Sequence, residues 1–260
     1  MNEGQSGFYL RAYSRLPDFL KRRINPLEYA IEDFIKAAAQ DSPGRVVLDA
    51  GAGEARFARH FRNQFYLAID SCVGDSTWDY SRVQVVADLS ALPLAAATVD
   101  TVLNVQVLEH VRNPLLVLSE IYRVLTHGGR LYLTAPQGWC EHQQPHDFYR
   151  FTRFALQDLL SSAGFSEIEI RPFGGYFHYL GHRLTFIPKI LFPRLPWIAR
   201  VLLFPFELAS LALFCLVLPI ACYYLDRLDP NPEFTLGYRC VARKLSTTEK
   251  GREKEKDRKD

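Results

Sequence analysis

Short apolar segments rich in β-branched residues alternate along this chain with stretches of helical periodicity, and this alternation restricts the fold more than any other feature. Short buried strands that alternate with helices are typical of a parallel sheet covered on both faces. The sequence therefore predicts an α/β fold, doubly wound around a mostly parallel seven-stranded sheet. The predicted strands are residues 45–49, 65–70, 83–88, 98–107, 130–135, 165–171 and 234–244.

Three predicted helices have recognisable starts. Asn25, followed by a proline, caps a helix that runs to Ala39. Asn113, also followed by a proline, caps a second helix, which we expect to end at the Gly128 pair. Thr152 caps a third.

Composition narrows the class of protein. The chain has 260 residues, of which 48% are hydrophobic and 23% charged, and its formal net charge is +2. These values fit one large globular domain, or one with an insertion, and leave no large basic surface for nucleic acid. The five cysteines are dispersed, which argues against a disulfide framework or a zinc knuckle. Because the N-terminus lacks the pattern of a secretory signal, we expect a cytoplasmic protein.

The expected organisation has four parts. A helical cap occupies residues 1–44, and a ligand-binding domain occupies 45–173 together with 233–245. A hydrophobic helical insertion, 174–232, precedes the last strand. The charged tail, 246–260, lacks apolar periodicity and is expected to be disordered.

Acidic residues and glycines gather where the first three strands end. Asp49 closes the first strand and is followed by Gly51 and Gly53, while Asp70 and Asp88 close the second and third. Ligands of such sheets bind beyond the carboxyl ends of the strands, where glycines let them approach the backbone. The alternative for the glycines is a tight turn alone, which leads into a helix expected at residues 54–62.

The spacing of these residues leaves two kinds of ligand open. Asp70 lies where a nicotinamide domain carries its ribose-binding acid. Against a nicotinamide cofactor, Arg56 replaces the third glycine of that motif and Asp49 would crowd a pyrophosphate. An acid beside the glycines is better suited to a cationic or zwitterionic ligand, such as an amino acid with a sulfonium group.

Five motifs in order carry a family resemblance. They are residues 46–55 (VVLDAGAGEA), 68–70 (AID), 87–89 (ADL), 98–104 with 107–111 (TVDTVLN, VLEHV), and 120–133. Together they resemble the motifs of class I S-adenosylmethionine-dependent methyltransferases, type 11-like. The resemblance implies a Rossmann-like fold, S-adenosylmethionine as the cofactor and methyl transfer as the activity.

The resemblance also implies roles for individual residues. Asp49, Gly51 and Gly53 would hold the methionine part of the cofactor, and Asp70 would accept hydrogen bonds from both ribose hydroxyls. Ala55 departs from the family, which often has a third glycine there.

Three further cofactor residues follow from the same resemblance. Asp88 would contact the adenine amino group, with the backbone of Leu89 beside it. Gln106 would lie near the methionine end or the transferred methyl group. The alternative for Asp88 is an N-cap of the turn that follows it.

Candidate catalytic residues lie in a loop after the fifth strand, residues 141–152 (EHQQPHDFYRFT), which also resembles a loop of one methyltransferase subgroup. His146 is the candidate general base, oriented by Asp147, and His110 is a second candidate. The alternative is a hydrogen-bonded lid without a catalytic role. A metal site built on His142 and His146 is disfavoured because Pro145 interrupts the helix it needs, so no metal is expected.

The insertion contains a long apolar stretch. Residues 201–225 are apolar except for Glu207, and the eighteen uncharged residues 208–225 meet the length of a membrane span. A single crossing would place the last two strands on opposite sides, so we expect a re-entrant hairpin or an in-plane helix pair through 186–225. The alternatives are a buried helical cap or a dimer interface; the oligomeric state is left open.

The sequence as a whole predicts an S-adenosylmethionine-dependent methyltransferase that acts on a small-molecule, lipid or lipid-linked carbohydrate acceptor. We expect a cytoplasmic protein, peripheral or monotopic at the inner face of a membrane, without a nucleic-acid partner. Two alternatives remain: a non-catalytic S-adenosylmethionine-binding protein recruited to a membrane, and a nicotinamide-dependent oxidoreductase.

Overall fold

The structure is a computed structural model that describes residues 13–74, 77–192, 197–246 and 249. The expected tail at 246–260 falls almost wholly outside these residues. The chain divides into two compact units. One contains the sheet, formed by Ile31–Pro172 and the described residues from Gly237 onward, and the other contains the described residues up to Ala30 with Phe173–Leu236.

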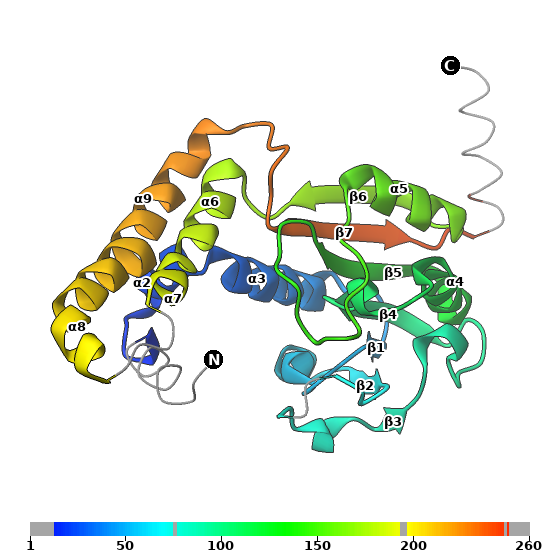
Figure 1. The fold of residues 1–260 in the computed structure, drawn as a ribbon. Coiled ribbons are helices and arrows are strands. Elements are labelled where there is room, and N and C mark those ends of the chain that lie inside the picture. The colour runs from blue at the N-terminus through cyan, green and yellow to red at the C-terminus, as the bar shows by residue number, and fades with distance from the viewer. Residues whose placement is uncertain (1–12, 75–76, 193–196, 247–248, 250–260) are drawn as a thin grey trace. The chain divides into compact units, whose positions relative to one another are not determined.

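The first unit is built on a single seven-stranded sheet in the order β3-β2-β1-β4-β5-β7-β6 (Figure 1). The five neighbouring strands β3, β2, β1, β4 and β5 are parallel. Strand β7 pairs antiparallel with both β5 and β6. The expected α/β architecture with a mostly parallel sheet is therefore confirmed. The strands are β1 (Val46–Ala50), β2 (Phe65–Asp70), β3 (Val85–Val86), β4 (Val99–Val105), β5 (Leu125–Pro136), β6 (Ser166–Pro172) and β7 (Gly237–Arg243).

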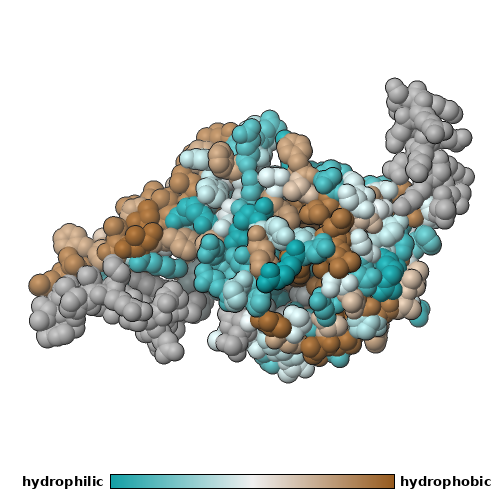
Figure 2. Space-filling view, turned by 45° about the vertical axis from the view of Figure 1, so that its right-hand side comes forward, coloured by the Kyte–Doolittle hydropathy of each residue, from teal (hydrophilic) through white to brown (hydrophobic). Residues whose placement is uncertain are grey.

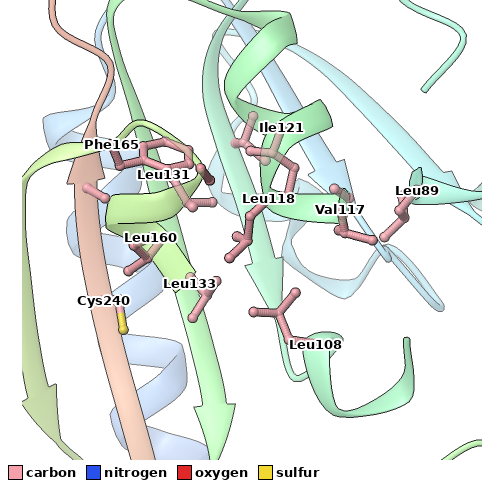
Figure 3. Packing of buried hydrophobic residues seen from close by; sticks show 14 of the residues in the cluster. Leu89, Leu108, Val117, Leu118, Ile121, Leu131, Leu133, Leu160, Phe165 and Cys240 are labelled. Atoms are coloured by element: carbon pink, nitrogen blue, oxygen red, sulfur yellow. The ribbon is translucent and has the colours of Figure 1, made fainter. Parts of the chain in front are cut away.

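Helices cover both faces of the sheet. Tyr132 of β5 contacts Phe34 of α3 (Pro26–Asp41), with ring centroids 5.8 Å apart. Its neighbours Leu131 and Leu133 point to the opposite face, because successive side chains alternate along a strand. There they join a buried cluster with α4 (Pro114–Val124) and α5 (Arg153–Ser162), as Figure 3 shows.

Two local expectations about helices were wrong. Helix α4 ends at Val124, and Gly128 lies inside β5 instead of ending the helix. The helix expected at 54–62 is a short 3₁₀ helix, Arg56–His60, because Ala55 before it takes a left-handed conformation (φ 51°) that delays the helical start. In contrast, Asn113 and Thr152 cap α4 and α5 through their side chains as predicted.

The second unit is helical. It contains α2 (Asp18–Ile24), α6 (Tyr176–Leu184), α7 (Ile187–Leu191), α8 (Trp197–Ala212), a π-helical turn (Leu213–Val217) and α9 (Leu218–Leu225). Helices α6 and α9 lie side by side (Figure 1). Gly181 permits their close approach, because a Cβ there would come within 2.9 Å of the Cys222 Cβ.

The end of α9 is tied to the start of α6. Asp226, just after α9, accepts hydrogen bonds from the amides of Gly175 and His178, and Asp229 accepts one from Tyr176. These bonds satisfy amides that have no partner within α6. The segment between β6 and β7 therefore forms a helical hairpin, α6 to α9, whose first and last residues lie at the same end.

A continuous apolar helix makes up the returning arm of this hairpin. Val201–Leu228 has a mean hydropathy of 2.4, and only 6% of its most apolar window is buried. Within the described residues it is the one helix long and apolar enough to cross a membrane. Figure 2 shows the hydrophobic side chains gathered over α8 and α9. The helix continues through Pro205 and reaches Pro219 through the π-helical turn, so neither proline ends it.

Candidate cofactor-binding site

The carboxyl ends of β1 and β2 bring the predicted acidic residues to one edge of the sheet. Asp49 lies one residue before the end of β1, and Asp70 ends β2. The strands are in register, with Asp49 opposite Ala68. Past the end of β1, the amides of Gly51 and Ala52 both donate to the carbonyl oxygen of Ile69, which turns the chain back over the strand ends.

The turn after β1 requires glycine. Gly51 has a φ of +87°, and a Cβ there would come within 2.4 Å of the Val107 side chain. Gly53 is also left-handed (φ +53°), and a Cβ there would lie 3.0 Å from the Trp78 ring. The turn therefore presents bare backbone, with Val107 on one side and an aromatic ring on the other. The role of Trp78 was not recognised in the sequence, because a lone tryptophan in a loop follows no motif.

Asp70 holds this turn in place. Its Oδ2 accepts a hydrogen bond of 2.8 Å from the amide of Gly53, and its Oδ1 accepts one of 2.7 Å from the amide of Cys72. Each carboxylate oxygen has a second lone pair that remains available to a ligand hydroxyl.

Asp49 is buried beneath the turn and accepts a hydrogen bond from the hydroxyl of Tyr66. Burial raises the pKa of Asp49 to about 7, against the lowering effect of the Tyr66 hydrogen bond. Near neutral pH, a positive group placed here would therefore favour the charged carboxylate.

Asp88 follows β3 and caps the next turn. Its Oδ1 accepts a hydrogen bond of 2.8 Å from the amide of Ser90, so the capping role considered for it is present. The Asp88 side chain is exposed, and the adjacent Leu89 is buried among the core residues of the sheet. A cap uses one carboxylate oxygen, so the same residue retains an oxygen for a ligand.

Two polar residues at the end of β4 face the same edge. Gln106 has a left-handed backbone (φ 55°), and its side chain donates to Thr134 Oγ1 of β5. Asn104 is fully buried; its side-chain amide donates to the Ala50 carbonyl, and its Oδ1 has no hydrogen-bond partner within the described ranges. Asn104 lies within a predicted motif, yet its burial beside Ala50 appears only once β4 is paired with β1.

The loop after β5 is organised by an ion pair. Arg150 donates two hydrogen bonds of 2.7 Å to the two carboxylate oxygens of Asp147, and it also donates to the carbonyls of Trp139 and Cys140. Asp147 further accepts from the amide of His142. These charge-assisted contacts hold the pKa of Asp147 at about 2.

The candidate catalytic residues are arranged differently from the expectation. Asp147 faces Arg150 and His142, so it does not orient the ring of His146. His146 is exposed, and its carbonyl accepts a hydrogen bond of 2.6 Å from Nδ1 of His110. His110 is partly buried, and burial lowers its pKa.

The same loop covers a buried carboxylate that the sequence analysis did not single out. Glu109 is fully buried, its two oxygens have no hydrogen-bond partner among the described residues, and burial raises its pKa to about 8. His110 and His142 lie beside it, with ring centroids 4.6 Å apart. The only sequence signal was the place of Glu109 within the motif 107–111 (VLEHV).

Comparisons with known proteins match the sheet-forming half of the chain. A family model described as a methyltransferase domain matches residues 48–133. A protein of Mycolicibacterium smegmatis named "Probable S-adenosylmethionine-dependent methyltransferase" is 32% identical over 150 residues, which are 53% of this chain and 57% of the relative. A malonyl-(acyl-carrier protein) O-methyltransferase of Herminiimonas arsenicoxydans is 31% identical over 143 residues, which are 49% of this chain and 55% of the relative.

A solved structure shows the same fold. A SAM-dependent methyltransferase from Archaeoglobus fulgidus aligns with a TM-score of 0.50 at 16% identity, covering 82% of this chain and 94% of that one. The curated relatives, by contrast, are matched over little more than half their own length. Together with the glycine turn between Asp49 and Asp70, these matches show that residues 48–133 are similar to the methyltransferase domain of S-adenosylmethionine-dependent methyltransferases and that the sheet has their fold.

Proposed function

We propose that this chain is an enzyme that transfers the methyl group of S-adenosylmethionine to a lipid or lipid-linked acceptor at a membrane surface. The observation that carries the cofactor part is the turn at Gly51 and Gly53, which is hydrogen-bonded to Asp70 above the buried Asp49. The acceptor part rests on the exposed apolar helix Val201–Leu228.

The residues of the turn fit this cofactor. A Cβ at Gly51 would clash with Val107 and one at Gly53 would press on the Trp78 ring, so glycine keeps the turn in the conformation against which we propose that the cofactor lies. Asp49 offers a carboxylate to the cationic methionine end, and Asp70 offers lone pairs to the ribose hydroxyls. Asn104 adds an amide oxygen without a partner. Asp88 and the Leu89 backbone are the proposed contacts of adenine, and Gln106 is proposed to face the methionine end.

The chemistry asked of the protein is modest. The bound cofactor supplies a methyl group activated by the sulfonium, so the chain has to orient the acceptor and, for a hydroxyl or amine, accept its proton. His146 remains the proposed base because its exposed ring lies on the loop after β5. Asp147 and Arg150 act through the shape of that loop.

The proposed lipid acceptor is supported by the exposed apolar surface of the helical unit. Several large hydrophobic residues on α8 are strongly exposed, including Leu202 at 72% and Phe206 at 66%. A continuous apolar patch of this kind marks an interaction surface, and a lipid surface is the occupant we propose. Because the helical hairpin leaves and returns at one end, it can lie in one leaflet without moving the sheet across the bilayer. The malonyl-(acyl-carrier protein) relative acts, by its name, on an acyl group held by a carrier.

The activity is tested by incubating the purified protein with methyl-labelled S-adenosylmethionine and detergent-dispersed total lipids. We expect label to enter the lipid fraction in the wild type and not in Asp70→Ala. Cofactor binding without label in lipids or in water-soluble extracts would contradict an enzymatic role and leave a non-catalytic binding protein.

Membrane association is tested by flotation with vesicles of phosphatidylcholine and phosphatidylglycerol. We expect the wild type to float and a Leu202→Gln/Phe206→Gln variant to stay at the bottom. The matched control is Phe154→Gln on α5, since Phe154 is equally exposed at 71% but lies in the sheet unit. A wild type that remains at the bottom, or that floats no better than the double variant, would contradict the lipid surface.

A further inference from the structure

We propose that Glu109, His110 and His142 bind one divalent first-row transition-metal ion, such as Mn²⁺, Fe²⁺, Co²⁺ or Zn²⁺. One ligand atom from each of these residues lies within 4.8 Å of the other two. The site considered in the sequence analysis used His142 with His146. In the structure His110 takes the place of His146, which contacts His110 through its backbone carbonyl.

The hydrogen bonds of the two histidines fix which ring nitrogen is available. Nδ1 of His110 lies 2.6 Å from the carbonyl oxygen of His146, and Nδ1 of His142 lies 3.1 Å from that of Cys140. A carbonyl oxygen only accepts, so each Nδ1 carries the proton and donates. In the neutral rings, each Nε2 is therefore a lone-pair acceptor, which is the form that binds metals.

Both of these lone-pair nitrogens lie near the same carboxylate. Nε2 of His110 is 3.8 Å from Glu109 Oε1, and Nε2 of His142 is 4.0 Å from it. These distances are too long for hydrogen bonds. Glu109 is fully buried, and in the part of the chain that the structure describes neither of its oxygens has a hydrogen-bond partner. Buried polar groups that face one another without a hydrogen bond are costly, and a cation that binds between them, with loss of any carboxyl proton, removes that cost.

The spacing is close to what a metal requires. Imidazole nitrogen and carboxylate oxygen bind at about 2.0 to 2.2 Å, so two ligands of one ion lie about 3 to 4 Å apart. The two nitrogens and Oε1 are near this range, and small side-chain rotations would close the site. Two imidazoles and one carboxylate also form the set that leaves coordination positions open in catalytic metal sites.

Hydrogen bonds around the cluster fix the orientation of its side chains. The carbonyls that accept from the two Nδ1–H groups orient the rings, as outer partners of metal-bound histidines do. The amide of His142 donates to Asp147, which Arg150 fixes, and the amide of Phe148 donates to the carbonyl of Glu109. The loop after β5 is thus attached to the cluster on two sides.

The cluster lies at the same edge of the sheet as the glycine turn. Glu109 and His110 follow β4 in a 3₁₀ turn, Leu108–His110, and Val107 just before it packs against Gly51. An ion with open positions here would bind an oxygen of an acceptor and favour its deprotonated form. Metal binding itself does not depend on the proposed methyl transfer, so the two can fail separately.

The test is a titration of metal-free protein with Co²⁺ or Zn²⁺, followed by calorimetry and, for Co²⁺, by visible absorption. We expect one equivalent to bind, and Glu109→Gln and His142→Gln to weaken binding at least about tenfold, as loss of a metal contact does. The matched control is His127→Gln; His127 lies on β5, bonds to the carbonyl of Leu245 and is outside the cluster.

A second measurement covers variants that fail to fold. X-ray absorption of the Zn²⁺-loaded wild type should show a first shell of nitrogen and oxygen with two imidazoles and no sulfur. A wild type that binds no equivalent of either ion, binding equally weakened in His127→Gln, or a shell containing sulfur would overturn the proposal.

Discussion

The amide of Gly53 donates a hydrogen bond of 2.8 Å to Oδ2 of Asp70, which joins the turn after β1 to the end of β2. The same carboxylate also accepts from the amide of Cys72 through Oδ1. Asp70 thus sets the shape of two loops at the edge where we propose the cofactor binds. Replacing Asp70 should therefore weaken ligand binding in two ways, by removing its own contact with the ligand and by releasing the two loops that it holds.

The two roles of Asp88, capping and adenine binding, are separated by a matched pair of variants. Asp88 and Asp79 each cap a 3₁₀ turn by accepting from the amide two residues on, at 2.8 and 3.0 Å. Asp88→Ala and Asp79→Ala should each lower the stability by a similar small amount, because each removes a cap. Only Asp88→Ala should weaken S-adenosylmethionine binding, measured by calorimetry. Equal affinities in the two variants would leave Asp88 as a cap alone.

The affinity for S-adenosylmethionine should rise with pH through neutrality. Burial raises the pKa of Asp49 to about 7, so below that pH the carboxyl must lose a proton to face a cationic ligand. Between pH 6 and 8 the affinity should rise about tenfold, with proton release on binding at the lower pH. Asp49→Asn should remove this dependence while keeping a partner for Tyr66. A slope unchanged in that variant would contradict the role of Asp49.

The buried ion pair of the loop should matter for stability. Asp147 has a side-chain exposure of 3%, and Arg150 donates to both of its oxygens. Asp147→Asn leaves the Arg150 charge without its partner, so we expect a loss of about 2 to 4 kcal/mol in urea unfolding. The control is Glu169→Gln in an exposed pair with Arg171, at 58% and 64% exposure, which should cost less than about 1 kcal/mol. Equal losses would show that burial of the pair is irrelevant.

Acidification should loosen the helical unit. Burial lowers the pKa of His182 on α6 from 6.5 to about 4, so this ring is neutral when folded and gains a proton on unfolding between these values. The folded state is therefore not penalised above pH 6.5. As the pH falls toward 4, the free energy of unfolding declines by at most about 3 kcal/mol, because the unfolded chain binds the proton more readily. Hydrogen exchange of α6 amides, corrected for intrinsic rates, should show this decline. The decline should disappear in His182→Gln and persist in His127→Gln.

The order of the elements could be predicted because it follows local patterns. Phe65 to Asp70 was predicted as a strand with the boundaries that the structure shows, and Thr152 caps α5 as its position before the helix indicated. Gly128 was misread because a glycine pair after a helix is a common stop. Here Gly128 lies within β5, and its amide donates to the carbonyl of Lys244, just after the distant last strand.

The candidate site was predictable only where a motif ran along the chain. Asp49, Gly51, Gly53 and Asp70 follow one another within two strands, so their convergence could be inferred from the sequence. The cluster of Glu109 and His142 could not, because their 33-residue separation is closed by the pairing of β4 with β5 and by the ion pair of Arg150. Asp147 was assigned to His146 because the two are adjacent, yet its carboxylate faces elsewhere.

The most direct test of the central claim is calorimetric titration of the purified protein with S-adenosylmethionine, S-adenosylhomocysteine and NADH, repeated on Asp70→Ala. We predict micromolar binding of the two adenosyl ligands by the wild type, no binding of NADH, and loss of at least about tenfold in affinity in the variant, equal to about 1.4 kcal/mol. Binding of NADH alone, or no binding of either adenosyl ligand by folded wild-type protein, would contradict the account.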